Sequence, residues 1–440
     1  MKKRLCALLT LLLCAPALAA AEISLSPAGT FSNYAYFEDD CALVIDANED
    51  YLEGLFDLQG NELIPCAYES LSGYGVEGYY VAQTEEGLNV RGALDARGSE
   101  VIPFQYGDIL FLSERWAVGV TLEVTSIQPC DYEDYIDDLD YNAVSYDVYD
   151  LSGPGYVGYF THQGCEVIRA HGDYLYVQNR DGDVAIYDEN LRLVRDGLAS
   201  PYNAYATENG DVVCLSTGAV ILPGHRFGAE LGAGRLSVSD DRYKIGVCDL
   251  EGNLLTDCEY DAVYGYDANG FARVEKDEKC GLIDLDGNLV VPCEFDGIEY
   301  LRYGSGYTSR VGGYSCVQRD GAYNYAGADG ALAFPVDYKN VTIVGLSMVL
   351  TDNRGQLFIA AADGTLTRTD YAAISPFPGG DGTLLKAQDE SGQWHLIDWH
   401  GNELTQEALP YAVSALIAAD GSAVLIETDG GKTAYTVQHT

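Results

Sequence analysis

Basic residues are scarce in this chain, which carries 25 Lys and Arg against 68 Asp and Glu, for a formal net charge of −43. A surface this acidic repels phosphate backbones and anionic lipid headgroups, so nucleic-acid binding is not expected. It attracts cations, basic peptides and basic proteins instead. The same acidity also keeps a β-rich protein soluble and protects exposed strand edges, so the charge does not by itself specify a partner.

Motifs of known chemistry are also missing. The sequence contains no GxSxG, HExxH or SxxK motif and no Gly-rich phosphate loop. It has no CxxC pair, and its six His have no metal-ligand spacing. We therefore expect no catalytic residue, no cofactor and no metal site. A glycan hydrolase with paired carboxylates is the alternative, because so many acids bring some pairs close together.

Long apolar runs are absent after the N-terminus. Lys2-Lys3-Arg4 precedes an apolar stretch over 5–13, and Ala17-Leu18-Ala19 then supplies small residues for cleavage. This pattern predicts a secretory signal peptide over 1–21 and a repeat array over 22–440. Lipidation of Cys14 is disfavoured because Leu13 precedes it. No later stretch is long enough to span a membrane, so we expect an extracytoplasmic chain, secreted or associated with the cell surface.

Of the twelve cysteines, ten remain after removal of this peptide, an even number that permits disulfides. Cys66, Cys258 and Cys293 each lie six residues after a turn glycine. A residue that recurs at one repeat position is typical of a small core side chain. Most thiols are therefore expected to be free and buried.

What the sequence does contain is a repeat. Gly281-Leu282-Ile283-Asp284 is followed by Gly287, Val291-Pro292 and Phe295, and the same order recurs from Gly54, Gly92 and Gly246. In the clear repeats the turn glycines are 34 to 38 residues apart. Such a period indicates an array of one small unit that is stacked or closed into a ring.

The unit itself reads as three short strands. Residues 271–276 alternate in polarity, 281–285 and 289–295 are apolar, and Asp286-Gly287-Asn288 is a hairpin signal. Helical periodicity is almost absent after residue 21. The prediction is an all-β tandem array of about ten short antiparallel β-meander repeats, propeller-like or curved, with an open superhelical β-solenoid as the alternative.

An aspartate recurs three residues before the turn glycine, as Asp57, Asp95, Asp249, Asp284 and Asp398. This placement predicts turn formers whose carboxylates accept hydrogen bonds from nearby backbone N–H groups. The run from Asp284 to Asn288 also resembles a calcium loop, but Glu294 lies seven residues after Gly287, where the loop requires six. A Ca²⁺-stabilised structural repeat is therefore a further, less favoured alternative.

These repeats resemble the WG-repeat (KWG repeat) family, whose unit reads Lys-Trp-Gly, Ile-Asp, a turn Gly, Val-Ile-Pro and Tyr-Asp. The best matches are Lys279-Cys280-Gly281-Leu282-Ile283-Asp284 and Lys244-Ile245-Gly246-Val247-Cys248-Asp249. The signature Trp is replaced by Cys280 and Ile245, and it survives as Trp394. The resemblance implies a β-rich repeat array and implies no reaction.

One segment breaks the period. An acidic, Tyr-rich insertion occupies 121–157, densest at 130–150. Insertions in repeat arrays form loops on one face, often the binding face, although a solvated, partly disordered loop is the simpler interpretation. Trp399, expected in a turn and more open than Trp394, could stack on a sugar. The candidate partner-binding residues are Tyr132, Tyr135, Asp137, Asp138, Tyr141, Tyr146 and Trp399.

Together these features predict a non-enzymatic, exported binding or scaffold module. Repeat arrays offer broad surfaces and need no catalytic residue. The expected partner is a protein, a peptide or a cell-wall glycan.

Overall fold

The computed structural model describes residues 23–31, 35–38, 42–46, 52–73, 76, 78–84, 87–128, 138–161, 163–303, 306–311, 313–334, 340–344, 346–352, 354–376, 383–404, 415–417, 423–428 and 431–439. Over these ranges the secondary structure is entirely β-strand, so the all-β prediction is confirmed. The same ranges contain no helix that is long and apolar enough to span a membrane.

The described strands form eleven antiparallel sheets of three or four strands and one two-stranded hairpin. In chain order the first five sheets are β2 (Ala35–Glu38), β3 (Ala42–Asp46), β4 (Glu53–Phe56) and β5 (Glu62–Tyr68); β6 (Ser70–Gly73), β7 (Tyr79–Gln83), β8 (Arg91–Asp95) and β9 (Glu100–Tyr106); β10 (Asp108–Phe111), β11 (Trp116–Gln128), β12 (Asp138–Asp150) and β13 (Gly155–Thr161); β14 (Val167–His171), β15 (Tyr174–Gln178), β16 (Val184–Tyr187) and β17 (Leu193–Leu198); and β18 (Tyr205–Glu208), β19 (Asp211–Cys214) and β20 (Val220–Leu222). The next three are β21 (Arg226–Gly232), β22 (Arg235–Ser239) and β23 (Ile245–Asp249); β24 (Ala262–Tyr266), β25 (Ala272–Lys276), β26 (Lys279–Ile283) and β27 (Leu289–Phe295); and β28 (Gly297–Ile298), β31 (Ser315–Arg319) and β32 (Ala322–Ala326), with the hairpin β29 (Leu301–Tyr303) and β30 (Gly306–Thr308) between β28 and β31. The last three are β33 (Asn340–Val344), β34 (Ser347–Thr351), β35 (Leu357–Ala361) and β36 (Leu366–Thr369); β37 (Ala373–Pro376), β38 (Leu384–Gln388) and β39 (Trp394–Asp398); and β40 (Ala415–Ile417), β41 (Ala423–Thr428) and β42 (Gly431–His439), which β1 (Ile23–Phe31) joins.

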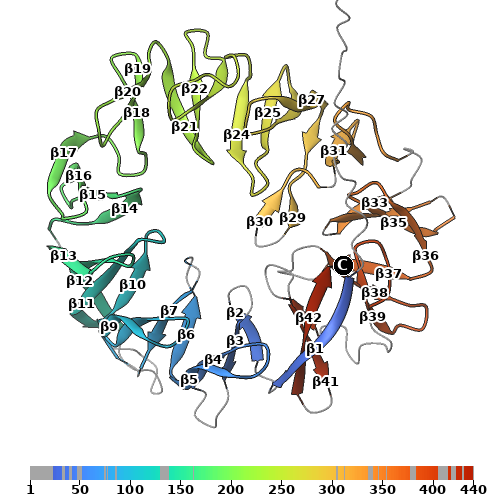
Figure 1. Cartoon of the computed structure of the whole chain (residues 1–440), viewed down its shortest axis with the longest axis horizontal. Helices are drawn as coiled ribbons and strands as arrows, with labels where there is room; N and C mark the ends of the chain where they lie inside the picture. The colour runs from blue at the N-terminus through green and yellow to red at the C-terminus, as the bar shows by residue number, and fades with distance from the viewer. Residues whose placement is uncertain are drawn as a thin grey trace, which may run out of the picture.

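The sheets follow one another around a ring (Figure 1). The ring is closed by the sheet ordered β1-β42-β41-β40, in which a strand from the start of the chain joins three from its end by pairing with β42. β1 runs antiparallel to β42 from Ile23 opposite His439 to Phe31 opposite Lys432. Of the two predicted architectures, the propeller-like ring is the one observed.

The unit differs from the predicted three-stranded meander, because seven of the eleven sheets have four strands. The predicted strands over 271–276, 281–285 and 289–295 correspond to β25, β26 and β27, and β24 adds the fourth. Sequence periodicity did not reveal this strand because its pattern is weak: the side chains of β24 are exposed or half-buried throughout.

The structure explains why a strand glycine recurs in the repeat. A Cβ on Gly281 would lie 2.7 Å from the carbonyl oxygen of Val291 and 2.7 Å from Sγ of Cys293. The register of β26 against β27 shifts at this point, between Cys280 and Leu282. The glycine therefore lets the outer strand cross closely over its neighbour.

Neighbouring sheets are also tied by a recurring polar contact. Lys244 forms an ion pair with Asp261 of the next sheet, and the other oxygen of Asp261 accepts the backbone N–H of Asp277 at 2.8 Å. The following repeat has the same arrangement, made by Lys279, Asp296 and the N–H of Asp320. The Lys and the Asp of the repeat thus meet across a sheet boundary.

The apolar core lies between successive sheets, with no single centre. One cluster combines Leu55 and Ile64 of the first sheet with Leu71, Tyr80 and Leu94 of the second. This is the packing expected of repeats that are too small to bury their own faces.

The prediction for the cysteines is confirmed over the described residues, where eight cysteines are free and five of these are buried. Burial raises the pKa of the Cys165 thiol to about 12, so this thiol is inert at neutral pH. Cys41 and Cys130 lie outside the described residues.

The recurring aspartates are turn formers, as predicted. Asp284 Oδ1 accepts the N–H groups of Asp286 at 3.0 Å and Asn288 at 2.8 Å. The same pattern is formed at Asp57, Asp95 and Asp398, and Asp249 accepts the N–H of Asn253. The backbone of each turn thus uses Oδ1 of its aspartate, and in every case but Asp95 the Oδ2 atom accepts the side-chain amide of an Asn in the same turn.

Candidate binding surface

The period-breaking segment forms a long hairpin. β11 and β12 have thirteen residues each, and they pair from Trp116 opposite Asp150 to Gln128 opposite Asp138. The expectation of a partly disordered loop over 130–150 is therefore wrong for 138–150, which is a regular strand.

The candidate partner-binding residues of this segment fall into three groups. Tyr132, Tyr135 and Asp137 lie outside the described residues, while Asp138 and Tyr141 belong to the backbone of β12, opposite Gln128 and Val124. Tyr146 is half-buried against the cluster that contains Trp116 and Phe160.

Trp399 lies far from this hairpin. It occupies the predicted turn after β39, and the sheet that contains β39 lies across the ring from β11 and β12 (Figure 1). Trp399 packs against two core clusters, so it is less open than the sequence suggested. The structure therefore does not bring Trp399 together with the tyrosines of the hairpin.

Asn89, a residue of the preceding sheet, holds the first strand of the hairpin. Asn89 Nδ2 donates to the carbonyl oxygen of Leu122 at 2.8 Å, and the N–H of Leu122 donates to Asn89 Oδ1 at 2.8 Å. Asn89 has a φ of 57°, a left-handed conformation that Asn tolerates better than most residues. This amide clamp fixes the hairpin where it leaves the ring.

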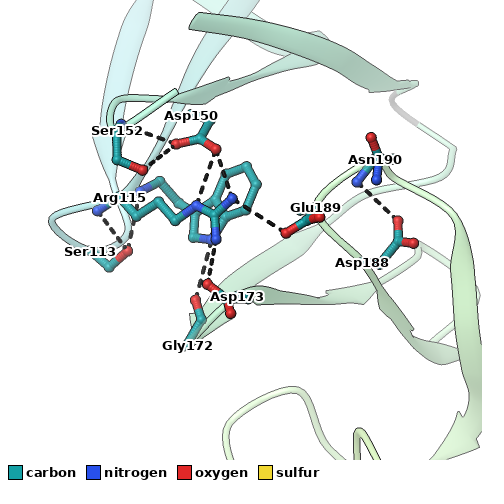
Figure 2. A network of polar contacts seen from close by, with 10 residues as sticks. Ser113, Arg115, Asp150, Ser152, Gly172, Asp173, Asp188, Glu189 and Asn190 are labelled. Atoms are coloured by element: carbon teal, nitrogen blue, oxygen red, sulfur yellow. Dashed lines mark hydrogen bonds and ion pairs between the residues drawn. The ribbon is translucent and has the colours of Figure 1, made fainter. Parts of the chain in front are cut away.

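On the other side an arginine joins the hairpin to the next sheet (Figure 2). Arg115 donates to Asp150 Oδ2 from Nε at 3.1 Å and from Nη2 at 2.8 Å, and it also forms ion pairs with Asp173 and with Glu189, the latter at 3.5 Å. Its guanidinium lies 4.8 Å from the ring of Trp116.

The charges of this joint shift the pKa values of its members. The hydrogen bonds from Arg115, and then those from Ser152, lower the pKa of Asp150. In return, Asp150 and then Asp173 raise the pKa of Arg115. Trp116 Nε1 donates to the carbonyl oxygen of Gly172 at 3.3 Å. With its donors occupied by partners from two sheets, Arg115 stabilises the joint and does not resemble a catalytic group.

A cluster of tyrosines surrounds one carboxylate on the opposite face of β12. Tyr106 donates to Asp147 Oδ2 at 2.8 Å, and the hydroxyl oxygens of Tyr106 and Tyr149 are 2.6 Å apart. Tyr159 lies directly opposite Asp147 in the sheet, and Tyr156 lies opposite Tyr149. Burial, and then the Asp147 charge, raise the pKa of Tyr156.

Sequence reasoning missed this cluster because Tyr156 and Tyr159 lie outside the dense acidic stretch. One signal could have found it. From 116 to 168 the chain contains no Lys or Arg, while it contains ten Asp or Glu. The acids of this region therefore have few cations of their own to pair with.

A groove lies elsewhere, between the sheets of β33–β36 and β37–β39. It has a volume of about 960 Å³, and its lining includes Arg354, Phe358, Tyr371 and Asp389. Across the described residues no three His, Cys, Asp or Glu side chains gather closely enough to hold a metal ion.

The fold places this chain in a class, the all-β ring of repeated antiparallel sheets. Within that class, the family described as WG containing repeat matches residues 54–87, 245–280 and 281–321. These three regions thus consist of WG-type repeats, as their sequence predicted. Each matched region starts in one sheet and ends in the next, which agrees with the Lys–Asp contact between sheets.

Other comparisons give only distant likenesses. No curated protein matches the chain. Among solved structures it is similar to a crystal structure of the eukaryotic initiation factor, with 11% identity over 81% of this chain and 93% of that chain and a TM-score of 0.36. It is also similar to BamB from Moraxella catarrhalis, with 11% identity over 96% of this chain and 99% of that chain and a TM-score of 0.23.

Proposed function

We propose that this protein is an exported, non-enzymatic binding module and that its β11–β12 hairpin receives a basic protein or peptide. The observation that carries the proposal is the combination of shape and charge at this hairpin. Two strands of thirteen residues, the longest described, extend one sheet in a stretch with ten acids and no Lys or Arg. Such a concentration of one charge attracts a partner of the opposite charge and steers its approach.

The anchoring of the hairpin supports the same function. Asn89 holds it from the preceding sheet, and Arg115 joins its base to the following sheet. A binding element that is held in place before its partner arrives loses less conformational entropy on association.

A charge-neutralised variant tests the proposal. The six acids D131N, E133Q, D134N, D137N, D138N and D140N are replaced together, and binding of a capped lysine-rich peptide is measured by calorimetry at low and high salt. Because each exposed ion pair contributes about 0.2–1 kcal/mol, affinity should fall roughly tenfold or more. The matched control neutralises six exposed acids of other sheets: Glu62, Glu100, Asp181, Glu251, Asp286 and Glu390.

Equal loss in both variants would show that only the overall charge binds the peptide, and it would contradict a site on the hairpin. Export has a separate test, the mass of the protein recovered from the cells that make it. A mature chain that starts at Glu22 supports export, and a chain that retains residues 1–21 contradicts it.

A glycan is the second candidate ligand, favoured by the groove of about 960 Å³ with its tyrosine, arginine and carboxylate lining. Saccharide sites combine an aromatic platform with polar groups of this kind. Titration with soluble cell-wall oligosaccharides, and loss of binding in Tyr371→Ala, would support it. If the unaltered chain does not bind these oligosaccharides, a glycan is not the ligand.

A further inference from the structure

The tyrosine cluster around Asp147 has two exposed members. Tyr156 is 52% exposed and Tyr159 is 59% exposed, although both are large rings on a well-packed sheet. Tyr159 stands on the same face of the sheet as Asp147, because directly opposed residues of antiparallel strands share a face. Tyr156 lies opposite Tyr149, two residues along β12 from Asp147 and beyond a shift in register. The half-buried carboxylate therefore lies directly opposite one exposed tyrosine, and its charge acts on the other.

Hydrogen bonds from the buried side of the sheet hold Asp147 in place. Tyr106 donates to its Oδ2, and Gln105 and Tyr149 reach the hydroxyl of Tyr106 at 3.0 Å and 2.6 Å. Tyr106 and Tyr149 are both buried, so this chain of hydrogen bonds is rigid. Among the described residues no Lys or Arg pairs with Asp147, and its Oδ1 accepts no hydrogen bond from them.

Elsewhere in the chain, arginine side chains cover several tyrosine rings. Arg169 lies over Tyr202 at 5.1 Å, Arg226 over Tyr243 at 5.2 Å and Arg273 over Tyr264 at 4.0 Å. In the described structure no cation covers Tyr156 or Tyr159. The local sequence explains this difference, since 116–168 supplies no Lys or Arg.

We propose that Tyr156, Tyr159 and Asp147 form a recognition site for an arginine side chain of the basic partner. The inference rests on the proposed function and deepens it by naming the residue type that is recognised. A guanidinium stacks on a tyrosine face while its N–H groups reach a carboxylate, whereas a lysine ammonium is a more strongly hydrated point charge without a plane to stack. The site therefore selects arginine over lysine.

The test compares two capped Gly/Ser peptides of equal length and charge, one built with arginine and one with lysine. We expect the unaltered protein to bind the arginine peptide more tightly, by about two- to fivefold for each ring engaged. Y156L/Y159L should lose this preference while it keeps its affinity for the lysine peptide. Y156F/Y159F, which retains the aromatic faces, should keep the preference.

Two further variants sharpen the result. Asp147→Asn removes the charge and should weaken binding of the arginine peptide, while Tyr307→Leu, at a tyrosine that is 56% exposed in another sheet, should change nothing. Circular dichroism establishes that each variant is folded before it is compared.

The outcomes separate this inference from the proposed function. If both peptides bind equally well and the six-acid variant still weakens both, the arginine site is wrong and the basic-partner function stands. If Y156L/Y159L keeps the arginine preference, the site is not at these rings. If neither peptide binds the unaltered protein, both proposals are overturned.

Discussion

At the scale of single residues, the turn glycine of the repeat has two roles. Gly287 has a φ of 79°, and a Cβ there would lie 2.4 Å from the carbonyl oxygen of Leu255 in the preceding sheet. Gly60 occupies the same turn position, with a φ of 85°, and a Cβ there would meet nothing within 4 Å. A substitution at Gly60 would thus meet backbone strain alone, whereas one at Gly287 would also disturb the close packing between sheets.

We expect Gly60→Ala to lower the free energy of unfolding by about 1–2 kcal/mol, the cost of a left-handed residue with a Cβ. Gly287→Ala should lower the free energy of unfolding further, because the backbone carbonyl of Leu255 cannot move aside as freely as the end of a flexible side chain. Thermal and urea unfolding of the two variants measures the difference. Equal losses would show that the contact between sheets relaxes and that only strain matters.

A second residue-scale prediction concerns pH. His400 Nε2 lies 2.9 Å from Asp363 Oδ2 in the turn of the neighbouring sheet, and the His400 side chain is only 7% exposed. The Asp363 carboxylate, together with Asp398, raises the pKa of His400 above 6.5 against the opposing effect of burial. Despite the same opposing effect, His400 and the N–H of Thr365 lower the pKa of Asp363 from 3.8 to about 2.

The directions of these two pKa shifts define the pH range in which the pair stabilises the fold. The raised pKa of His400 contributes stability that is complete below pH 6.5 and is lost as pH rises through the folded pKa. The lowered pKa of Asp363 contributes stability that is complete above pH 3.8 and is lost as pH falls through about 2. The free energy of unfolding of the unaltered chain should thus exceed that of His400→Gln by most between pH 3.8 and 6.5. This gap should narrow as the pH rises above 6.5. Urea titrations across pH measure this gap, and a gap that widens above pH 7 would contradict the assignment.

At the scale of elements, the turns were predictable and the links between sheets were not. Asp284 and Gly287 lie three residues apart and form one turn, so a local pattern contains all the information. The four groups that meet at Arg115 come from 115, 150, 173 and 189, which only the ring brings together. The candidate site shows the same limit, because Tyr106 joins Asp147 across two sheets.

The hairpin offers a prediction of its own. Asn89→Gly keeps a residue that tolerates the φ of 57° and removes both hydrogen bonds to Leu122. We expect faster hydrogen exchange of the β11 amides from 118 to 128, with the melting temperature changed by only a few degrees, because each hydrogen bond contributes about 1 kcal/mol. Asn179→Gly, at a turn residue of another sheet, serves as the control. Unchanged exchange in β11 would show that the sheet alone holds the hairpin.

At the scale of the whole molecule, the ring depends on a contact between the two ends of the chain. β1 covers the edge of β42, and without it this strand would present its backbone N–H and C=O groups to solvent. The closing sheet also packs on both of its neighbours, since Leu425 and Ala434 share a core cluster against which Phe56 packs, and Val424 shares another with Leu384. Closure therefore couples the first, last and penultimate sheets.

Removing residues 1–31 tests this coupling. We expect a lower melting temperature, faster hydrogen exchange in β41 and β42, and association that increases with protein concentration, because an unpaired edge strand accepts other strands. A synthetic peptide with the sequence of 23–31 should restore the melting temperature by pairing with β42, as donor strands do in other sheets, while a scrambled peptide should not. If the truncated chain melts like the full chain and ignores the peptide, β1 does not hold the ring closed, and the packing of successive sheets alone accounts for its stability.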